Sequence, residues 1–232
     1  MMLRTLTAAL GIVGAGLLGA CSSSTGPATS RNNPGTGTST LQVTADIDAN
    51  DDPTVIGGFT TDYTASVRDG LRNKVSGATV TISNAALGTI TLPETAPGSG
   101  DYALTGNTFP SGDFRLDVVR GTDNVHGVVL GGPGVHSITA PVANATVPAN
   151  QPLTVRWTVP SQAKSAEVET NNFGPVTLPD TGAYVVAGAS NPPTASQRIR
   201  VFRFNEVDIA GGLPGSRLHV QVRQTVQPVT VQ

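Results

Sequence analysis

Apolar and polar residues alternate along most of the chain after residue 40. A period of two places successive side chains on opposite faces of a β-strand, so each such run predicts a strand with one buried face. The apolar positions of these runs are Leu41, Val43, Ala45, Ile47, Tyr63, Ala65, Val67, Val80, Ile82, Tyr102, Leu104, Phe114, Leu116, Val118, Leu153, Val155, Trp157, Val159, Leu218, Val220 and Val222.

Turn-forming residues separate these runs at short intervals. Asp69-Gly70, Ser76-Gly77, Ser111-Gly112 and Gly131-Gly132-Pro133-Gly134 are examples, and each favours a reversal of the chain. Many short strands divided by such turns are typical of a β-sandwich. We therefore predict an all-β fold of two tandem immunoglobulin-like β-sandwiches, the first over residues 41–135 and the second over residues 136–232.

The composition supports this fold class and excludes others. The 232 residues include 27 glycines and 17 prolines, which interrupt helices, while only 13% of residues are charged and 4% are aromatic. A coiled coil, a helical bundle and a polytopic membrane protein are excluded. The net charge of -2 gives no electrostatic reason to expect a nucleic acid partner.

The first residues have the organisation of an export signal. Arg4 gives a positive start, residues 5–18 carry no charge, and the segment ends in Leu18-Gly19-Ala20-Cys21. This ending resembles the lipobox of bacterial lipoproteins, in which an aliphatic residue and two small residues precede a cysteine. Cys21 is the single cysteine of the chain. The alternative is an ordinary secretory signal with a chance cysteine.

The lipobox resemblance implies cleavage after residue 20 and a lipid on Cys21 that fastens the protein to the membrane. Ser22 in the next position favours the outer membrane under the sorting rule of enteric bacteria. Residues 21–40 contain no apolar side chain larger than alanine apart from the cysteine, so they are predicted to form a disordered tether.

Residues 60–121 resemble the carboxypeptidase-regulatory-like, or transthyretin-like, family of small sandwiches. The likeness rests on Val67-Arg68-Asp69-Gly70, on residues 75–82, on Gly100-Asp101-Tyr102 and on residues 112–118. Other bacterial immunoglobulin-like modules have much the same pattern. These families imply an accessory or structural module without catalytic residues of its own.

The second segment resembles a fibronectin type III or related immunoglobulin-like domain. Residues 152–160 match its second strand, in which a tryptophan anchors the core, and Trp157 is the single tryptophan of the chain. We predict that Trp157 lies at the centre of the second core. Residues 218–223 lack the tyrosine that such domains usually carry on a late strand, so the superfamily stays open.

The strand predicted over residues 197–204 breaks the alternation. In a regular strand, Arg198 and Arg200 share a face with Phe202 and Phe204, and a β-bulge near Val201 or Phe202 would separate them. With that bulge, a basic stripe of Arg198, Arg200, His219 and Arg223 would face outward. The stripe would suit an acidic partner or an anionic glycan. The alternative is a solvated sheet face neutralised by residues such as Glu167 and Glu169.

Residues Asp46–Asp52 are the strongest metal candidate, because alternate oxygen side chains resemble the first half of a calcium loop. The loop pattern then fails, with Asp51 in place of glycine and Gly57 in place of glutamate. A polar turn is the favoured interpretation.

The histidines and the remaining carboxylates give no catalytic pattern. His126 and His136 flank the glycine-rich turn and would meet only if it forms a hairpin, and a metal site would need a third ligand. We expect both to be solvated turn residues and His219 to lie on the polar side of its strand. Asp113, Asp117, Glu167 and Glu169 are expected to be surface charges rather than a glycosidase pair.

Two functional hypotheses remain. The favoured one is a bacterial envelope lipoprotein, without cofactor or catalysis, that acts as a binding, adhesion or scaffold module for a protein or glycan partner. The alternative is an accessory domain of a carbohydrate-active or peptidase system. The ten aromatic residues leave few for sugar binding, which favours the first hypothesis.

Overall fold

The computed structural model describes residues 32–161 and 163–232. The predicted signal segment, Cys21 and the first part of the predicted tether lie outside these residues. Apart from one turn of 3-10 helix (Gly188–Ser190), the regular elements of the described chain are strands. They are β1 (Asn33–Gly37), β2 (Gln42–Asp51), β3 (Phe59–Arg68), β4 (Thr79–Asn84), β5 (Gly88–Leu92), β6 (Asp101–Gly106), β7 (Asp113–Arg120), β8 (Asp123–Gly131), β9 (Ile138–Ala140), β10 (Thr146–Val147), β11 (Leu153–Trp157), β12 (Ser165–Thr170), β13 (Phe173–Leu178), β14 (Ala183–Val186), β15 (Thr194–Asp208) and β16 (Arg217–Val231).

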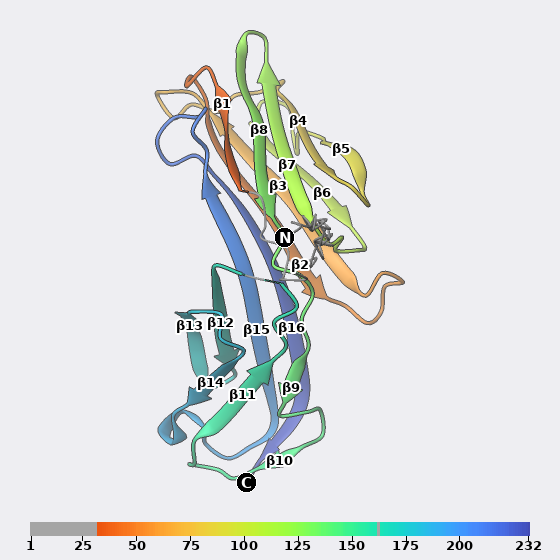
Figure 1. The fold of residues 1–232 in the computed structure, drawn as a ribbon, viewed down its shortest axis with the longest axis vertical. Helices are drawn as coiled ribbons and strands as arrows, with labels where there is room; N and C mark the ends of the chain where they lie inside the picture. The colour runs from red at the N-terminus through yellow and green to blue at the C-terminus, as the bar shows by residue number, and fades with distance from the viewer. Residues whose placement is uncertain (1–31, 162) are drawn as a thin grey trace, which may run out of the picture.

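The strands form three sheets in two units placed end to end (Figure 1). A five-stranded sheet, β1-β8-β7-β4-β5, covers one unit, and a three-stranded sheet, β14-β11-β9, covers the other. Both pack on an eight-stranded sheet in the order β13-β12-β15-β16-β2-β3-β6, with β10 paired to β16. The all-β sandwich prediction is therefore confirmed.

Each unit has its own hydrophobic core, and the alternating sequence pattern explains both. The first core joins residues such as Ile47, Tyr63 and Val220 to residues of the five-stranded sheet such as Leu116 and Val128. The second core contains nine buried residues, namely Leu153, Val155, Trp157, Ala166, Val168, Val186, Ile199, Val201 and Val229. Trp157 is 4% exposed within it, as predicted.

Two predicted inward positions fall at the margins of these cores. Leu104 is 37% exposed on β6, the edge strand of the large sheet, and Val159 is 45% exposed beyond the end of β11.

No helix in the described ranges has the length and apolar character that a bilayer crossing requires.

The last two strands belong to both units. β15 and β16 are 15 residues long each and pair with each other over almost their whole length. The first half of β16 also pairs in parallel with β2, from Arg217 opposite Thr44 to Arg223 opposite Asn50. The predicted boundary at 135/136 falls in the linker between β8 and β9. Residues 136–232 are nevertheless not a separate unit, because the first sandwich takes its strand beside β2 from them.

The prediction of a disordered tether up to residue 40 is wrong for residues 33–37. These residues form β1, which pairs antiparallel with β8. The main chain then continues along the protein, where Thr38 N donates to Asn124 O and Ser39 N to Gly211 O. Backbone hydrogen bonds hold this edge strand without any large buried side chain, so the absence of apolar residues did not predict disorder here.

Gly211 packs directly against the main chain of β1. A Cβ at Gly211 would lie 2.0 Å from the Thr36 carbonyl carbon, so even a methyl group displaces the strand. Gly211→Ala should therefore lower the free energy of unfolding by about 1–3 kcal/mol, the usual cost of overpacking. Hydrogen exchange of the β1 amides, measured by mass spectrometry, should accelerate.

Gly174→Ala is the matched control, because a Cβ at Gly174 meets nothing within 4 Å. It should leave exchange in β1 unchanged. Unaltered β1 protection in Gly211→Ala would contradict this account of the packing.

Candidate functional site

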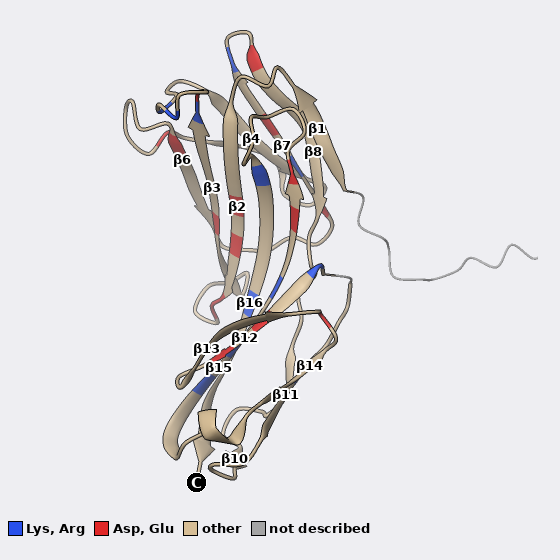
Figure 2. Ribbon diagram, turned by 90° about the vertical axis from the view of Figure 1, so that its left-hand side faces the viewer, with Lys and Arg blue, Asp and Glu red and all other residues tan. Residues whose placement is uncertain are grey.

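The outer face of the eight-stranded sheet carries most of the charged residues that the sequence singled out. Side chains of β2, β3, β15 and β16 alternate between the cores and this outer face. Figure 2 shows acidic residues on β2 and β3 and basic residues on the neighbouring β15 and β16. The face is therefore divided into an acidic and a basic part.

The acidic run is neither a calcium loop nor, for the most part, a turn. Residues up to Asp51 belong to β2, and only Asp52 opens the turn, where it accepts hydrogen bonds from Thr54. Asp46 pairs with Arg217 at 2.9 Å. Within the described ranges, no group of three or more His, Cys, Asp or Glu side chains is placed to hold a metal ion.

Asp48 lies among like charges in this acidic part. Burial and the neighbouring Asp46 raise the pKa of its carboxyl above the ordinary value. Asp62 stands directly opposite on β3 and adds to the effect. The like charges make this part of the face unfavourable for an anionic ligand.

The predicted bulge near Val201 or Phe202 is wrong. Register shifts on β15 lie between Thr194 and Ile199, and the pairing with β16 is regular from Ile199 to Asp208. Phe202 and Phe204 therefore share the outer face with Arg198 and Arg200, while the residue between the two phenylalanines points inward. The apolar–polar alternation of the sequence breaks at this point because the inward residue between the two phenylalanines is a buried arginine.

The predicted basic stripe is divided into two parts. His219 packs on Phe204, with ring centroids 5.2 Å apart, and lies 3.7 Å from Glu206. The three arginines Arg198, Arg200 and Arg223 instead gather around one groove of about 410 Å³. The other residues that line the groove are Asp51, Pro53, Thr225 and Gln227.

Glu169 neutralises part of this positive charge. This agrees with the alternative in which nearby carboxylates neutralise the basic sheet face. Its Oε1 accepts a 2.5 Å hydrogen bond from Arg200 and lies 3.9 Å from Arg198 Nη2. Glu167 makes no such ion pair and accepts from Thr177 Oγ1 at 3.3 Å. The neutralisation is thus confirmed for Glu169 alone.

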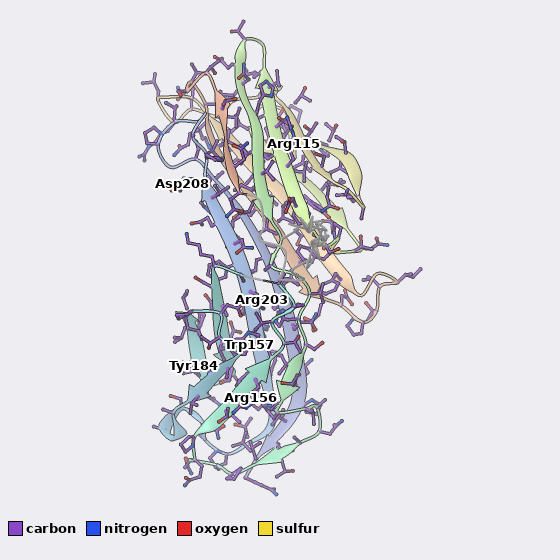
Figure 3. All side chains as sticks on the ribbon, in the orientation of Figure 1. Arg115, Arg156, Trp157, Tyr184, Arg203 and Asp208 are labelled. Carbon is purple, nitrogen blue, oxygen red and sulfur yellow. The ribbon has the colours of Figure 1, made fainter. Side chains whose placement is uncertain are left out.

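The inward residue of β15 is Arg203, which sequence reasoning did not select. Its side chain is 0% exposed, and Asp180, at 2% exposed, accepts from its Nη2 at 2.6 Å and from its Nε at 2.9 Å. Trp157 Nε1 donates to the second oxygen of Asp180 at 2.9 Å. Figure 3 shows Arg203 and Trp157 close together below the junction of the units. This buried pair therefore connects the second core to β15.

Arg203 also holds the linker between the units. It donates to Pro133 O at 2.5 Å, to Gly134 O at 3.2 Å and to Ser161 O. Asn205, one inward position further along β15, donates to Gly131 O at 2.7 Å. The glycine-rich segment is thus a bound linker rather than a hairpin.

His136 follows this linker and is buried, so the prediction of a solvated turn residue is wrong for it. Its ring is 1% exposed, and Nε2 lies 3.1 Å from Val201 O, as a donor to that carbonyl. Burial and the nearby Arg203 cation lower the pKa of His136 from 6.5 to about 4. The ring is therefore neutral at physiological pH.

His126 remains at the surface, on β8, with Nδ1 3.4 Å from Asp117. Because the linker is not a hairpin, the structure gives His126 and His136 separate partners. Their predicted meeting is not observed.

The remaining carboxylates lie on outward strand positions, as expected. Asp113 is exposed, and Asp117 accepts from Arg115 Nε at 2.7 Å and from Gly127 N at 2.7 Å. Glu167 and Glu169 lie on β12 in the other unit. Neither pair spans two facing strands, because Asp113 and Asp117 lie along β7 with three residues between them, and Glu167 and Glu169 lie along β12 on either side of Val168.

No family model matches the chain, and no curated protein sequence matches it. Solved structures of low similarity include the adhesin InvE of Yersinia pseudotuberculosis, at 17% identity and a TM-score of 0.26 over 80% of this chain. This chain spans 60% of the InvE chain. The fibronectin type III-like modules of CbhA from Clostridium thermocellum share 14% identity with a TM-score of 0.28, over 82% of this chain and 94% of that one. A 1.5-MDa bacterial ice-binding adhesin shares 13% identity with a TM-score of 0.26, over 84% of this chain and 66% of that one.

The fold thus defines an all-β protein of two stacked β-sandwiches. The two units share one continuous sheet.

Proposed function

We propose that this chain is a lipid-anchored protein of the bacterial envelope that presents a binding surface on a two-unit rod and performs no catalysis. The observation that carries the proposal is the order of its segments. A charged start, an uncharged stretch and Leu18-Gly19-Ala20-Cys21 are followed, after residues 22–32, by the first strand. Those residues would reach at most about 40 Å when fully extended.

The architecture supports a presenting role. Two strands that run through both units, together with the buried Arg203 pair at their junction, favour a rod that moves as one body. A lipid at Cys21 would hold this rod close to the membrane, with Ser22 favouring the outer membrane. The charged outer face is then available to a protein or glycan partner, in a binding, adhesion or scaffold role.

The anchor is tested by metabolic labelling with a clickable fatty acid in bacteria that express the full chain. The wild-type protein should incorporate the label and fractionate with membranes, and Cys21→Ala should lose both properties. Ser22→Ala is the matched control for labelling, because it leaves the cysteine in place. A wild-type chain that carries no label and is released from the cell in soluble form would refute the anchor.

A further inference from the structure

The groove around Arg198, Arg200 and Arg223 is positively charged and open to solvent. Its volume of about 410 Å³ lies in the range of small-molecule sites. It would hold roughly a dozen water molecules at about 30 Å³ each, so it exceeds the space that a single inorganic ion needs.

The carboxylates nearby do not balance the three cations. Glu169 is shared by Arg200 and Arg198. Asp51 is the single carboxylate in the lining, and its two oxygens accept from Thr225 N and Thr225 Oγ1, both at 2.9 Å. Its closest approach to Arg223 is 3.8 Å, which is too long for a hydrogen bond.

Two of the arginines retain unused donors. The Nε atoms of Arg198 and Arg223 are buried, and none of the described residues accepts a hydrogen bond from them. Burial and the neighbouring Arg200 lower the pKa of Arg223, because its charge is poorly solvated and faces a like charge. Buried N–H groups without a partner are costly, and an oxyanion beside the three guanidinium groups would offset their excess positive charge.

We propose that this groove binds a small organic anion through its carboxylate or phosphate oxygens. The guanidinium group presents paired donors that match such oxygens, and Arg223 and Arg200 approach the groove from neighbouring strands. Thr225 and Gln227 supply polar side chains in the same lining. The inference names a ligand class for the proposed binding function and in that respect rests on it, but the groove is independent of the lipid anchor.

The test uses the purified full chain, in detergent where it carries lipid, and follows the groove amides by NMR during titration. The probes are trigalacturonate, inorganic phosphate and, as the neutral counterpart, maltotriose. At low salt (about 20 mM), trigalacturonate or phosphate should shift the groove signals, and the affinity should fall with added salt. Maltotriose should have no effect. The stronger of the two anions identifies the ligand as a carboxylate or a phosphate.

Variants assign the binding to the groove. Arg223→Gln should weaken binding of the stronger anion at least about tenfold, because it removes a cation whose nearest carboxylate oxygen, on Asp51, is 3.8 Å away. Glu169→Gln should strengthen binding about threefold or more, because it removes a competing carboxylate. Arg115→Gln on the five-stranded sheet is the matched control and should retain wild-type affinity.

The gain in Glu169→Gln keeps the test valid if Arg223→Gln folds poorly. The proposal is overturned if neither anion shifts the groove signals, if maltotriose binds as well as trigalacturonate, or if Arg223→Gln and Glu169→Gln both keep wild-type affinity. None of these outcomes depends on whether Cys21 is lipidated.

Discussion

Arg203→Met is expected to lower the free energy of unfolding by about 3–5 kcal/mol, the usual cost of breaking a buried ion pair from one side. Methionine replaces the aliphatic part of the arginine side chain but leaves the Asp180 carboxylate buried and without its cation. The carbonyls of Pro133, Gly134 and Ser161 lose their donor as well. Denaturant-induced unfolding, followed by the fluorescence of Trp157, measures the change.

Arg200→Met is the matched control on the same strand. Arg200 also pairs with a carboxylate, but at 23% side-chain exposure, so its loss should cost no more than about 1 kcal/mol. The double variant Arg203→Met with Asp180→Asn should be more stable than Arg203→Met alone, because it removes the orphaned charge. Equal losses for Arg203→Met and Arg200→Met would show that the buried pair does not stabilise the junction.

Acidification is expected to destabilise the protein through His136. The pKa of His136 is about 4 in the folded protein, against 6.5 in an unfolded chain, so only the unfolded chain takes up the proton between these values. Stability from this group is therefore complete above pH 6.5 and is lost as the pH falls towards 4. The loss amounts to about 3 kcal/mol, since each pKa unit corresponds to about 1.4 kcal/mol.

His136→Gln isolates this contribution from the carboxylates that also titrate in acid. Its free energy of unfolding should fall less steeply than that of the wild type between pH 6.5 and 4, by up to about 3 kcal/mol. His126→Gln, which removes a surface histidine, is the comparison variant. Parallel pH profiles for the wild type and His136→Gln would contradict the assignment.

The sequence predicted the cores better than the junction. Alternation identified buried positions such as Val43, Leu116 and Trp157, because a period of two depends only on neighbouring residues. Sequence analysis did not select Arg203 and misplaced His136 at the surface, because the burial of each depends on a partner far away in the chain, Asp180 and Val201 O respectively. The one sequence signal for the burial of Arg203 was its spacing of two residues from Val201 and of four from Ile199, which places all three on the same face of the strand.

The groove was predicted in part. Three members of the expected basic stripe do gather, although the bulge invoked to place them outward is absent. His219 could not be separated from them by sequence, because its contact with Phe204 depends on the register of two long strands. Edge strand β1 was missed because main-chain pairing leaves no hydrophobic signature.

The parallel pairing of β16 with β2 restricts when this protein can complete its fold during synthesis. Val43 N donates to Ser216 Oγ across 173 positions of the chain. Until the last residues emerge, β2 has an unpaired edge that is open to association with other chains. Contacts so distant in sequence also close slowly. The N-terminal unit can therefore complete its fold only after β16 has been synthesised.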